Sequence, residues 1–192
     1  PASEIARDLV GKLEAGEYLT VENHHVSVER YWDLRYLPKL EGSERDLVAE
    51  LRTRLLETVQ CHMLSDVPLG AFLSGGIDSS LVTAMMSTLS PQPISTFSIG
   101  VQEADFNELP YARLVAEQYR TAHHEAIVDP HLVADLPEML WHIEEPVDPF
   151  AFGVYAVSKL ARGHVKVVIG GDGGDEMFAG YDRYVGNQLV DW

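Results

Sequence analysis

The sequence is poor in cysteine, in basic residues and in long apolar runs. Its 192 residues include one cysteine, Cys61, which excludes an internal disulfide framework. No stretch reaches the roughly 20 consecutive apolar residues that cross a bilayer, so we expect no membrane partner. Fourteen Lys and Arg residues against thirty Asp and Glu residues give a formal net charge of −16, which opposes contact with a nucleic acid backbone. We therefore expect a globular cytoplasmic protein that binds neither nucleic acid nor a membrane.

The length suffices for one hydrophobic core, and the order of the apolar segments indicates how it is built. Segments that predict strands alternate with segments that predict helices, as in parallel βαβ units with right-handed crossovers. The expected strands are residues 69–73, 94–100, 121–128 and 165–169, and the expected helices are residues 43–64, 79–89, 108–119, 131–142 and 151–162. The fold class is therefore α/β, an open doubly wound parallel sheet. Residues 16–21 and 26–32 predict a short amino-terminal β segment, with its turn at residues 22–25.

Cys61 lies in the long helix expected over residues 43–64. The apolar residues that recur there at helical spacing are Leu47, Leu51, Leu55, Leu56 and Val59. This spacing predicts one apolar helix face that is turned to the core. A lone cysteine in such a run is most often a small core residue, so we expect its thiol to be buried or half-buried.

A glycine-rich loop follows the first expected strand of the sheet. Residues 69–81 read Leu-Gly-Ala-Phe-Leu-Ser-Gly-Gly-Ile-Asp-Ser-Ser-Leu. Gly75 and Gly76 can adopt backbone angles that a Cβ disfavours, so successive N–H groups can turn towards one anion. A helix that starts directly after the loop directs its positive end to the same anion. The hydroxyl donors beside this loop are Ser74, Ser79 and Ser80.

The loop differs from two common phosphate loops. No lysine follows the second glycine, as it does in G-x-x-x-x-G-K-[ST], and the G-x-G-x-x-G spacing of dinucleotide sites is absent. Asp78 instead brings a carboxylate to the expected phosphate. This arrangement is chemically reasonable with Mg²⁺ between the two, because Mg²⁺ is usually held by one or two carboxylates and phosphate oxygens. The alternative is a glycine-rich turn in which Asp and Ser only cap a helix.

A second segment, residues 165–181, repeats this design. Residues 167–169 are the β-branched run Val-Val-Ile, typical of a strand covered on both faces, and four glycines then surround Asp172 and Asp175. Ligands of doubly wound sheets bind at the carboxyl ends of the strands, so we expect both loops to face one crevice. The alternative is an acidic surface turn.

Both loops carry a family resemblance. Residues 73–80, Leu-Ser-Gly-Gly-Ile-Asp-Ser-Ser, resemble the pyrophosphate loop of the ATP pyrophosphatases, which include asparagine, GMP and NAD synthetases and several tRNA-modifying enzymes. Residues 171–181, Gly-Asp-Gly-Gly-Asp-Glu-Met-Phe-Ala-Gly-Tyr, are similar to a more specific element of the glutamine-dependent asparagine synthetases. Further matches lie at residues 66–70, 96–100 and 144–146, so the resemblance spans nearly the whole chain. It implies a HUP-type fold, similar to the adenine nucleotide alpha hydrolases.

The resemblance implies a two-step synthesis. A carboxylate, the side chain of aspartate, attacks the α-phosphate of Mg-ATP, pyrophosphate leaves, and ammonia then displaces AMP to give asparagine. Asp78 and Asp175 match the family's metal ligands, and Mg²⁺ bound there would spread the charge of the leaving group. The residues that would hold pyrophosphate are Ser74, Gly75, Gly76, Ser79 and Ser80. The positions that match those flanking the adenosine are Leu73, Ser98, Ile99 and Gly171.

One departure from the family falls on a functional position. The family most often has glutamate where this chain has Asp172, a residue implicated in handling a proton or in positioning ammonia at the adenylate. The aspartate side chain is one methylene shorter, which moves its carboxylate about 1 Å or more towards the backbone and can matter for positioned catalysis. Asp172 remains the candidate catalytic residue, with a shift of substrate or geometry as the expected consequence.

The resemblance also implies a larger parent enzyme. Residues 1–40 resemble the tail of a glutaminase domain and its linker, and residues 41–192 the amino-terminal part of an ATP-pyrophosphatase synthetase domain. The amino-terminal cysteine nucleophile of the glutaminase and the catalytic lysine of the downstream half are both absent. Ammonia would therefore come from a glutaminase domain outside this chain, and we expect the full-length parent to form a homodimer.

Two classes of function remain open at this point. The first is the ATP-binding half of an AMP-producing, amide-forming synthetase, for asparagine or for another carboxylate such as a peptide or a sugar acid. The second is a nucleotide-binding or structural module with incomplete chemistry. Asp172 and the missing carboxyl half favour the second class, whereas the intact Asp78 and Asp175 favour the first.

Other polar residues have simpler interpretations. His123 and His124 are adjacent on an expected strand, so they point to opposite faces, and we interpret them as surface residues and not as metal ligands. Arg113 fits a solvated helix face. Glu144 and Glu145 fit either a solvated loop or a wall of the substrate site.

Overall fold

The computed structural model describes residues 13–128, 132–143, 151–184 and 186. The chain divides into two compact units, Pro1–Leu47 and Val48–Trp192, and each is described by itself. Within the described residues, no helix combines the length and the apolar character that a bilayer crossing requires.

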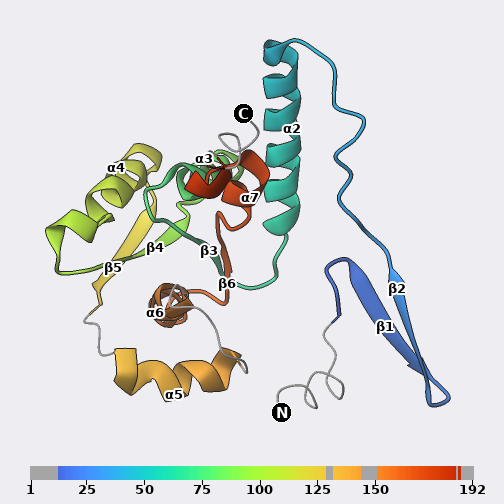
Figure 1. Cartoon of the computed structure of the whole chain (residues 1–192). Coiled ribbons are helices and arrows are strands. Elements are labelled where there is room, and N and C mark those ends of the chain that lie inside the picture. Colours follow the sequence, from blue (N-terminus) through green and yellow to red (C-terminus); the bar gives the residue numbers. More distant parts are fainter. Residues whose placement is uncertain (1–12, 129–131, 144–150, 185, 187–192) are drawn as a thin grey trace. The chain divides into compact units, whose positions relative to one another are not determined.

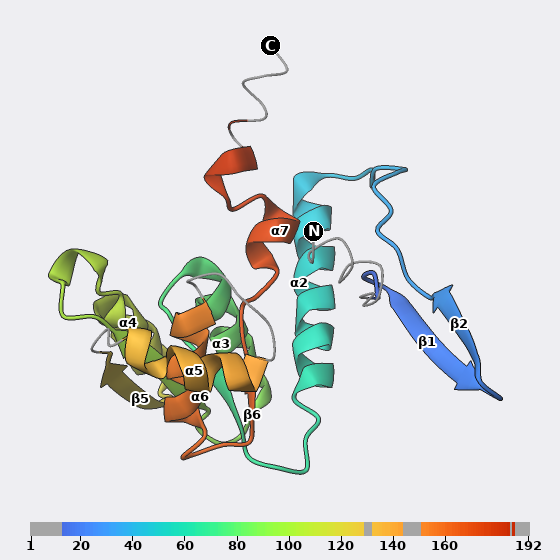
Figure 2. The same ribbon diagram turned by 60° about the horizontal axis from the view of Figure 1, so that its bottom comes forward.

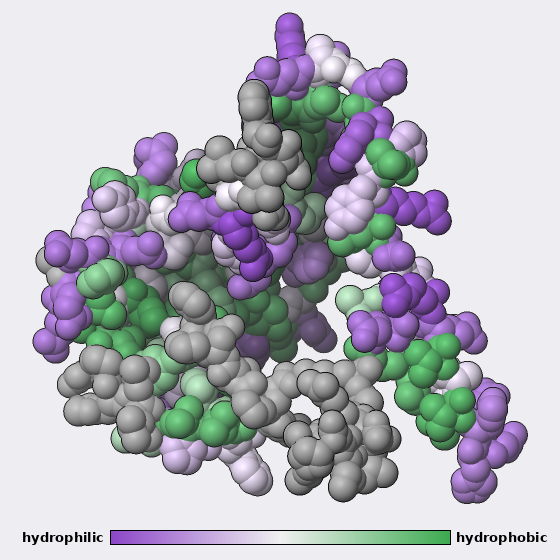
Figure 3. Space-filling model, in the orientation of Figure 1, coloured by the Kyte–Doolittle hydropathy of each residue, from purple (hydrophilic) through white to green (hydrophobic). Residues whose placement is uncertain are grey.

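The first unit contains an antiparallel hairpin of β1 (Glu17–Glu22) and β2 (His25–Arg30). Asn23 and His24 form its turn with φ values of 49° and 63°, the left-handed backbone that a two-residue hairpin turn requires. The amino-terminal β segment expected from the sequence is therefore confirmed, with a tighter turn. One face of the hairpin carries four exposed apolar side chains, which contribute to the green patch on it in Figure 3: Leu19, Val21, Val26 and Val28.

The second unit is built on a parallel sheet of four strands in the order β5-β4-β3-β6. The strands are β3 (Leu69–Phe72), β4 (Ser95–Gly100), β5 (Ala122–Ile127) and β6 (Val167–Ile169). The helices are α2 (Glu44–His62), α3 (Ile77–Leu89), α4 (Leu109–Tyr119), α5 (Leu132–Ile143), α6 (Ala151–Ala161) and α7 (Gly174–Phe178), with a 3-10 turn η1 (Ala104–Phe106). The expected open α/β fold is therefore confirmed, and the element boundaries agree within about two residues. The short helix α7 was not expected.

Both faces of the sheet are covered because its side chains alternate. Ala71 packs with α2 and α3, and Leu73 packs with α4, whereas Phe72, which lies between them in sequence, packs with α6 on the other face. Figure 1 shows α3 and α4 above the sheet and α6 below it, and Figure 2 brings α5 and α6 to the front. The side chains with less than 2% exposure include Phe97, Met86 and Leu109. The sheet is thus doubly wound, with one apolar layer on each side.

Cys61 corrects one expectation. The side of α2 that faces the sheet carries Leu55, Leu56 and Val59, as the helical spacing predicts. Cys61 lies two residues beyond Val59, which places it about 200° around the helix from the core-facing side. Its thiol is exposed, and the prediction of a buried or half-buried cysteine is wrong.

The adjacent histidines of β5 point to opposite faces, as expected, but they are half-buried and not surface residues. His123 Nδ1 lies 2.9 Å from the hydroxyl of Thr96, and Nε2 lies 3.1 Å from a carboxylate oxygen of Glu125. Arg113 holds the same carboxylate at 2.6 Å. These contacts join His123, Glu125 and Arg113 in a structural network on the α4 side of the sheet.

His124 lies on the other face. Its ring centre is 5.3 Å from that of Phe97 and 3.8 Å from that of His164. Burial lowers the pKa of both His123 and His124, and the neighbouring His164 lowers the pKa of His124 further. Both strand histidines are therefore held mainly in the neutral form at neutral pH. Glu144 and Glu145 lie outside the described residues.

Candidate functional site

The strand order places a crevice at one end of the sheet. From β3 the chain moves through β4 to β5 on one side, whereas β6 pairs with β3 on the other side. The direction of the connections reverses between β3 and β6, and ligands of such sheets bind at this point, outside the carboxyl ends of the strands. The loops that leave β3 and β6 are the two glycine-rich segments.

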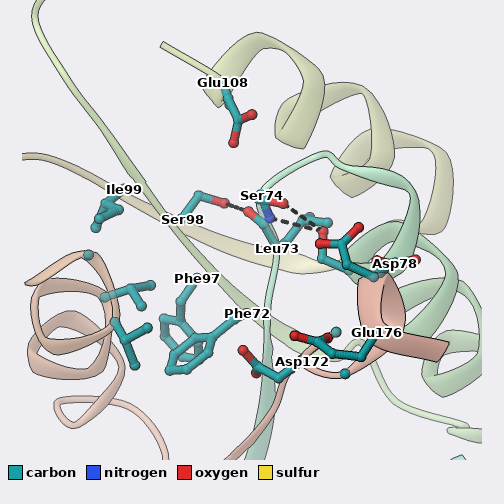
Figure 4. Close-up of a pocket in the computed structure, with 18 of the residues that line it drawn as sticks. Phe72, Leu73, Ser74, Asp78, Phe97, Ser98, Ile99, Glu108, Asp172 and Glu176 are labelled. Atoms are coloured by element: carbon teal, nitrogen blue, oxygen red, sulfur yellow. Dashed lines mark hydrogen bonds between the residues drawn. The ribbon is translucent and has the colours of Figure 1, made fainter. Parts of the chain in front are cut away.

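A pocket of about 550 Å³ lies at this position. Its walls come from the ends of β3, β4 and β6, from the start of α4 and from α6, as Figure 4 shows. Phe72 and Phe97 form its apolar part. The sequence-predicted site residues that line it are Leu73, Ser74, Asp78, Ser79, Ser98, Ile99, Gly171, Asp172 and Asp175.

Three predicted site residues lie outside this lining. Gly76 lines a neighbouring cavity that shares Asp78 and Asp175 with the pocket. Gly75, with φ of 88°, is packed against α4, where an added Cβ would lie 2.6 Å from the Ala112 nitrogen. Ser80 lies in the first turn of α3, and its buried hydroxyl has no hydrogen-bond partner among the described residues. Ser80 does not contribute to the pocket lining.

The two glycine-rich loops are in direct contact. An added Cβ at Gly171 would lie 2.8 Å from the Ser79 nitrogen and 3.0 Å from the Asp78 Cβ. An added Cβ at Gly174 would overlap the Asp78 carboxylate itself. Only residues without a Cβ allow the loop after β6 to approach α3 this closely, and this approach brings Asp175 into the same lining as Asp78.

The serines of the first loop hold its shape. The Ser79 hydroxyl accepts a hydrogen bond from the Ser74 nitrogen at 3.2 Å and lies 2.9 Å from the Ser74 hydroxyl. The Ser74 hydroxyl in turn accepts the Gly76 nitrogen at 3.2 Å. No side chain caps α3, which begins directly after Gly76, so the first amides of this helix stay open to a ligand. The loop thus combines hydroxyls with a helix N-terminus, a combination suited to phosphate.

At the other side of the pocket, the predicted adenosine positions also fix the sheet. The Ser98 hydroxyl donates to the Leu73 carbonyl, and the Leu73 nitrogen donates to the Phe97 carbonyl at 2.9 Å. Ser98 is 3% exposed, so its hydroxyl tethers β4 to the end of β3. The Leu73 carbonyl keeps one lone pair for a further donor. Ile99 turns its side chain to the pocket on this side, as Figure 4 shows.

The pocket contains three polar residues that were not assigned from the sequence: Glu108, Glu176 and Tyr181. The Tyr181 hydroxyl donates to a Glu176 carboxylate oxygen at 2.7 Å, and this bond raises the pKa of Tyr181 and lowers that of Glu176. The guanidinium of Arg183 lies 4.3 Å from the centre of the Tyr181 ring. Glu176 and Tyr181 lie in the residue 171–181 motif, which could have suggested them, whereas Glu108 was taken only as a helix start.

The lining is strongly acidic. Its carboxylates are Asp78, Glu108, Asp172, Asp175 and Glu176, and it has no lysine or arginine among the described residues. Nor do the described residues contain a group of three or more His, Cys, Asp or Glu side chains placed to hold a metal ion by themselves. The pair Asp78 and Asp175 still fits Mg²⁺, because this ion usually binds one or two carboxylates and completes its shell with phosphate oxygens and water.

The sheet topology and this crevice define an α/β protein of the HUP type. Comparison with known proteins gives the family, because the family model described as asparagine synthase matches residues 50–192. The chain belongs to the asparagine synthase family.

Individual relatives agree with this family. The chain is 35% identical over 178 residues to glutamine-hydrolysing asparagine synthetase 1 of Bacillus subtilis (strain 168), in a match that covers 91% of the chain and 28% of that protein. It is 36% identical over 187 residues to a putative asparagine synthetase of Methanocaldococcus jannaschii, with 94% and 36% covered. It is 33% identical over 196 residues to the amidase chyE of Penicillium rubens, with 91% and 29% covered. The chain thus spans about a third of the length of these relatives.

Proposed function

We propose that the chain is the ATP-binding part of an amide-forming ligase. The parent activates a carboxylate, the side chain of aspartate, as an acyl-adenylate with release of pyrophosphate, and ammonia then converts the adenylate to asparagine. Family membership supports the ligase chemistry. One observation carries the assignment to this pocket. Asp78 and Asp175, from two distant segments, line one crevice at the point where the direction of the strand connections reverses, between β3 and β6.

The first loop binds the phosphates that leave as pyrophosphate. Ser74 and Ser79 supply hydroxyls, and Gly75 and Gly76 give the turn that opens the first amides of α3. The Ser74 and Ser79 hydroxyls now bond each other, so they can exchange this internal bond for phosphate oxygens without a change of backbone. Ser80 would support the phosphate site only as part of α3, because its hydroxyl is buried outside the pocket lining and its amide donates to the Gly76 carbonyl at 3.0 Å.

Asp78 and Asp175 would hold Mg²⁺. Bound there, the ion supplies positive charge that offsets the charge of the departing pyrophosphate. The acidic lining makes such a cation necessary, because five carboxylates around a nucleotide polyphosphate repel it.

Asp172 acts in the second step of the reaction, in which ammonia attacks the adenylate. Its carboxylate lines the pocket from the loop after β6, beside the end of β3. We assign it to orient ammonia and to accept a proton as the amide forms. Leu73, Ser98 and Ile99 form the adenosine side, where main-chain groups contact the purine edge and the Ile99 side chain covers a face. Gly171, the fourth position that the family resemblance assigns to adenosine, lies where the loop after β6 meets the start of α3.

A different acceptor carboxylate is the second candidate. Aspartate at position 172 shortens the side chain that meets ammonia, and one relative at 33% identity is named an amidase. Both observations favour a change of acceptor over a loss of nucleotide chemistry.

The proposal includes partners outside this chain. Ammonia comes from a glutaminase domain, as the glutamine-hydrolysing names of the relatives suggest, and the full-length parent forms a homodimer. We place the activity in the cytoplasm, since a single exposed cysteine suits a reducing compartment.

Calorimetric titration of the 192-residue chain with ATP tests the nucleotide site. We expect weak binding that depends on Mg²⁺. Asp78→Asn removes one of the two metal ligands, so it should lower the affinity for Mg-ATP by about tenfold or more, as loss of a charge-assisted contact does. Asp105→Asn, an exposed acid in η1 that lies outside this lining, is the charge-matched control. Metal-independent binding that survives Asp78→Asn would contradict the assignment.

Pyrophosphate release by the full-length parent tests the acceptor. With ATP, Mg²⁺ and a panel of carboxylates, aspartate should give the fastest release, because formation of the acyl-adenylate frees one pyrophosphate per activated acid. If another acid gave pyrophosphate and aspartate gave none, the second candidate, a different acceptor carboxylate, would replace asparagine synthesis. Absence of release with every acid would remove the ligase proposal.

A further inference from the structure

Glu108 stands apart from the other acids of the pocket. Asp78 follows β3, and Asp172, Asp175 and Glu176 follow β6, so these four belong to the two glycine-rich segments. Glu108 enters from the start of α4 instead. Figure 4 shows its carboxylate pointing into the pocket from the α4 side, with Ile99 to one side of it and Asp78 to the other.

The backbone around Glu108 is firmly held. The Asn107 side-chain oxygen accepts the Leu109 nitrogen at 3.1 Å, and the Glu108 carbonyl accepts the Tyr111 nitrogen at 3.0 Å. Leu109, the next residue, is 1% exposed. The first turn of α4 also packs against Gly75 of the phosphate loop. The position of this carboxylate is therefore coupled to the loop that would bind the nucleotide.

A carboxylate in a nucleotide pocket needs a cation or a neutral donor opposite it. The described lining has no lysine or arginine, and the described residues contain no group of three metal-ligating side chains that would include Glu108. In the proposed binding mode the purine lies at Ile99 and the phosphates lie at Asp78. The part of the nucleotide between them is the ribose, which offers neutral hydroxyl donors to a carboxylate.

We infer that Glu108 binds the ribose of the nucleotide by accepting hydrogen bonds from its hydroxyls, and that it selects ribonucleotides over deoxyribonucleotides. The inference rests on the proposed function, since it takes ATP as the ligand of this pocket. It adds the residue that recognises the sugar, which neither the loop motifs nor the family match supplies.

The test compares ATP with 2′-deoxy-ATP and 3′-deoxy-ATP. Calorimetry of the 192-residue chain in Mg²⁺ gives the affinity ratio of ATP to each analogue. For the wild-type chain we expect a ratio of about ten for at least one analogue, as for a hydrogen bond to a charged group. In Glu108→Ala this ratio should fall to about one, and in Glu108→Gln, which keeps one acceptor oxygen, it should lie between the two. Each variant changes the net charge of the protein, but this change affects ATP and its analogues equally because they carry the same phosphates. It therefore cancels in the affinity ratio.

Glu117→Gln is the matched control, since Glu117 is an exposed acid near the other end of α4 and lies outside the lining. It should keep the wild-type ratio. A ratio near one in the wild type, or a ratio that Glu108→Ala leaves unchanged, would overturn the role of Glu108 while ATP binding itself stands. A wild-type chain that does not bind Mg-ATP at all would overturn the proposed function, and the ribose contact with it.

Discussion

Gly171 shows how strongly one missing methyl group can shape the pocket. It is the residue at which the loop after β6 meets the start of α3, 2.8 Å from the Ser79 nitrogen when measured from an ideal Cβ position. Backbone atoms on the helix side cannot rotate away as a side chain can. Any side chain here therefore separates the two loops that carry Asp78 and Asp175.

Gly171→Ala should consequently weaken both folding and binding. Overpacking at a tight contact costs about 1–3 kcal/mol, and displacement of the loop should lower the affinity for Mg-ATP as well. Urea unfolding and ATP titration measure the two effects. Gly163→Ala, where an added Cβ would lie 3.7 Å from the nearest atom, should leave both nearly unchanged. Equal behaviour of the two variants would show that the contact at Gly171 is unimportant.

At single residues, the sequence indicates candidates for chemistry but does not fix the exposure of a side chain. Asp78 and Asp175 could be singled out because carboxylates beside glycines after a strand have few structural uses. The exposure of Cys61 could not be read from helical spacing, because spacing shows that one face is apolar but does not fix how wide that face is. Glu108 was missed because a glutamate before a helix is ordinary in sequence, and only the fold turns it towards the pocket.

At the scale of elements, the strands and the long helices follow from their apolar periodicity. The hairpin could be placed for the same reason, since apolar and polar residues alternate in β1 and β2 on either side of a short turn. Helix α7 could not, because its five residues, Gly174–Phe178, show less than two helical turns and begin at a glycine. Its formation depends on the close packing of Gly174 against Asp78, a contact between distant segments.

The contact between Gly75 and α4 illustrates the same limit for site residues. The sequence predicts that Gly75 turns the chain for a phosphate, and its φ of 88° requires a residue without a Cβ. The structure adds a second reason, because the first turn of α4 fills the space where a side chain would lie. The local pattern thus predicts a turn at Gly75, and tertiary packing gives a second reason for a glycine at this position.

For the whole molecule, the strand histidines predict a pH dependence of stability. Burial lowers the pKa of His123 and His124 below the ordinary value of 6.5, so the unfolded chain binds protons more readily than the folded one. Their contribution to stability is therefore complete above about pH 6.5 and is lost as the pH falls below it. Glu125, whose pKa is lowered mainly by its bond from Arg113, adds a further loss at more acidic pH.

Urea unfolding between pH 7.5 and pH 5 should accordingly show a free energy of unfolding that decreases towards acid. His124→Gln removes one of the two groups and should flatten this dependence. The same substitution at the exposed His25 of the hairpin reports what the loss of any surface imidazole does. A wild-type stability that rises as the pH falls through 6.5 would contradict the assigned direction of the shifts.

The position of β6 in the sheet determines when the sheet can be completed during synthesis. Leu69 pairs with Val167, so one edge of the inner strand β3 stays uncovered during synthesis until β6 has left the ribosome. The strand that finally covers this edge also delivers Asp172 and Asp175. In the proposed function, completion of the sheet and competence for nucleotide therefore arise together, and a bound nucleotide, by favouring only the completed form, would stabilise the pairing of β6 with β3.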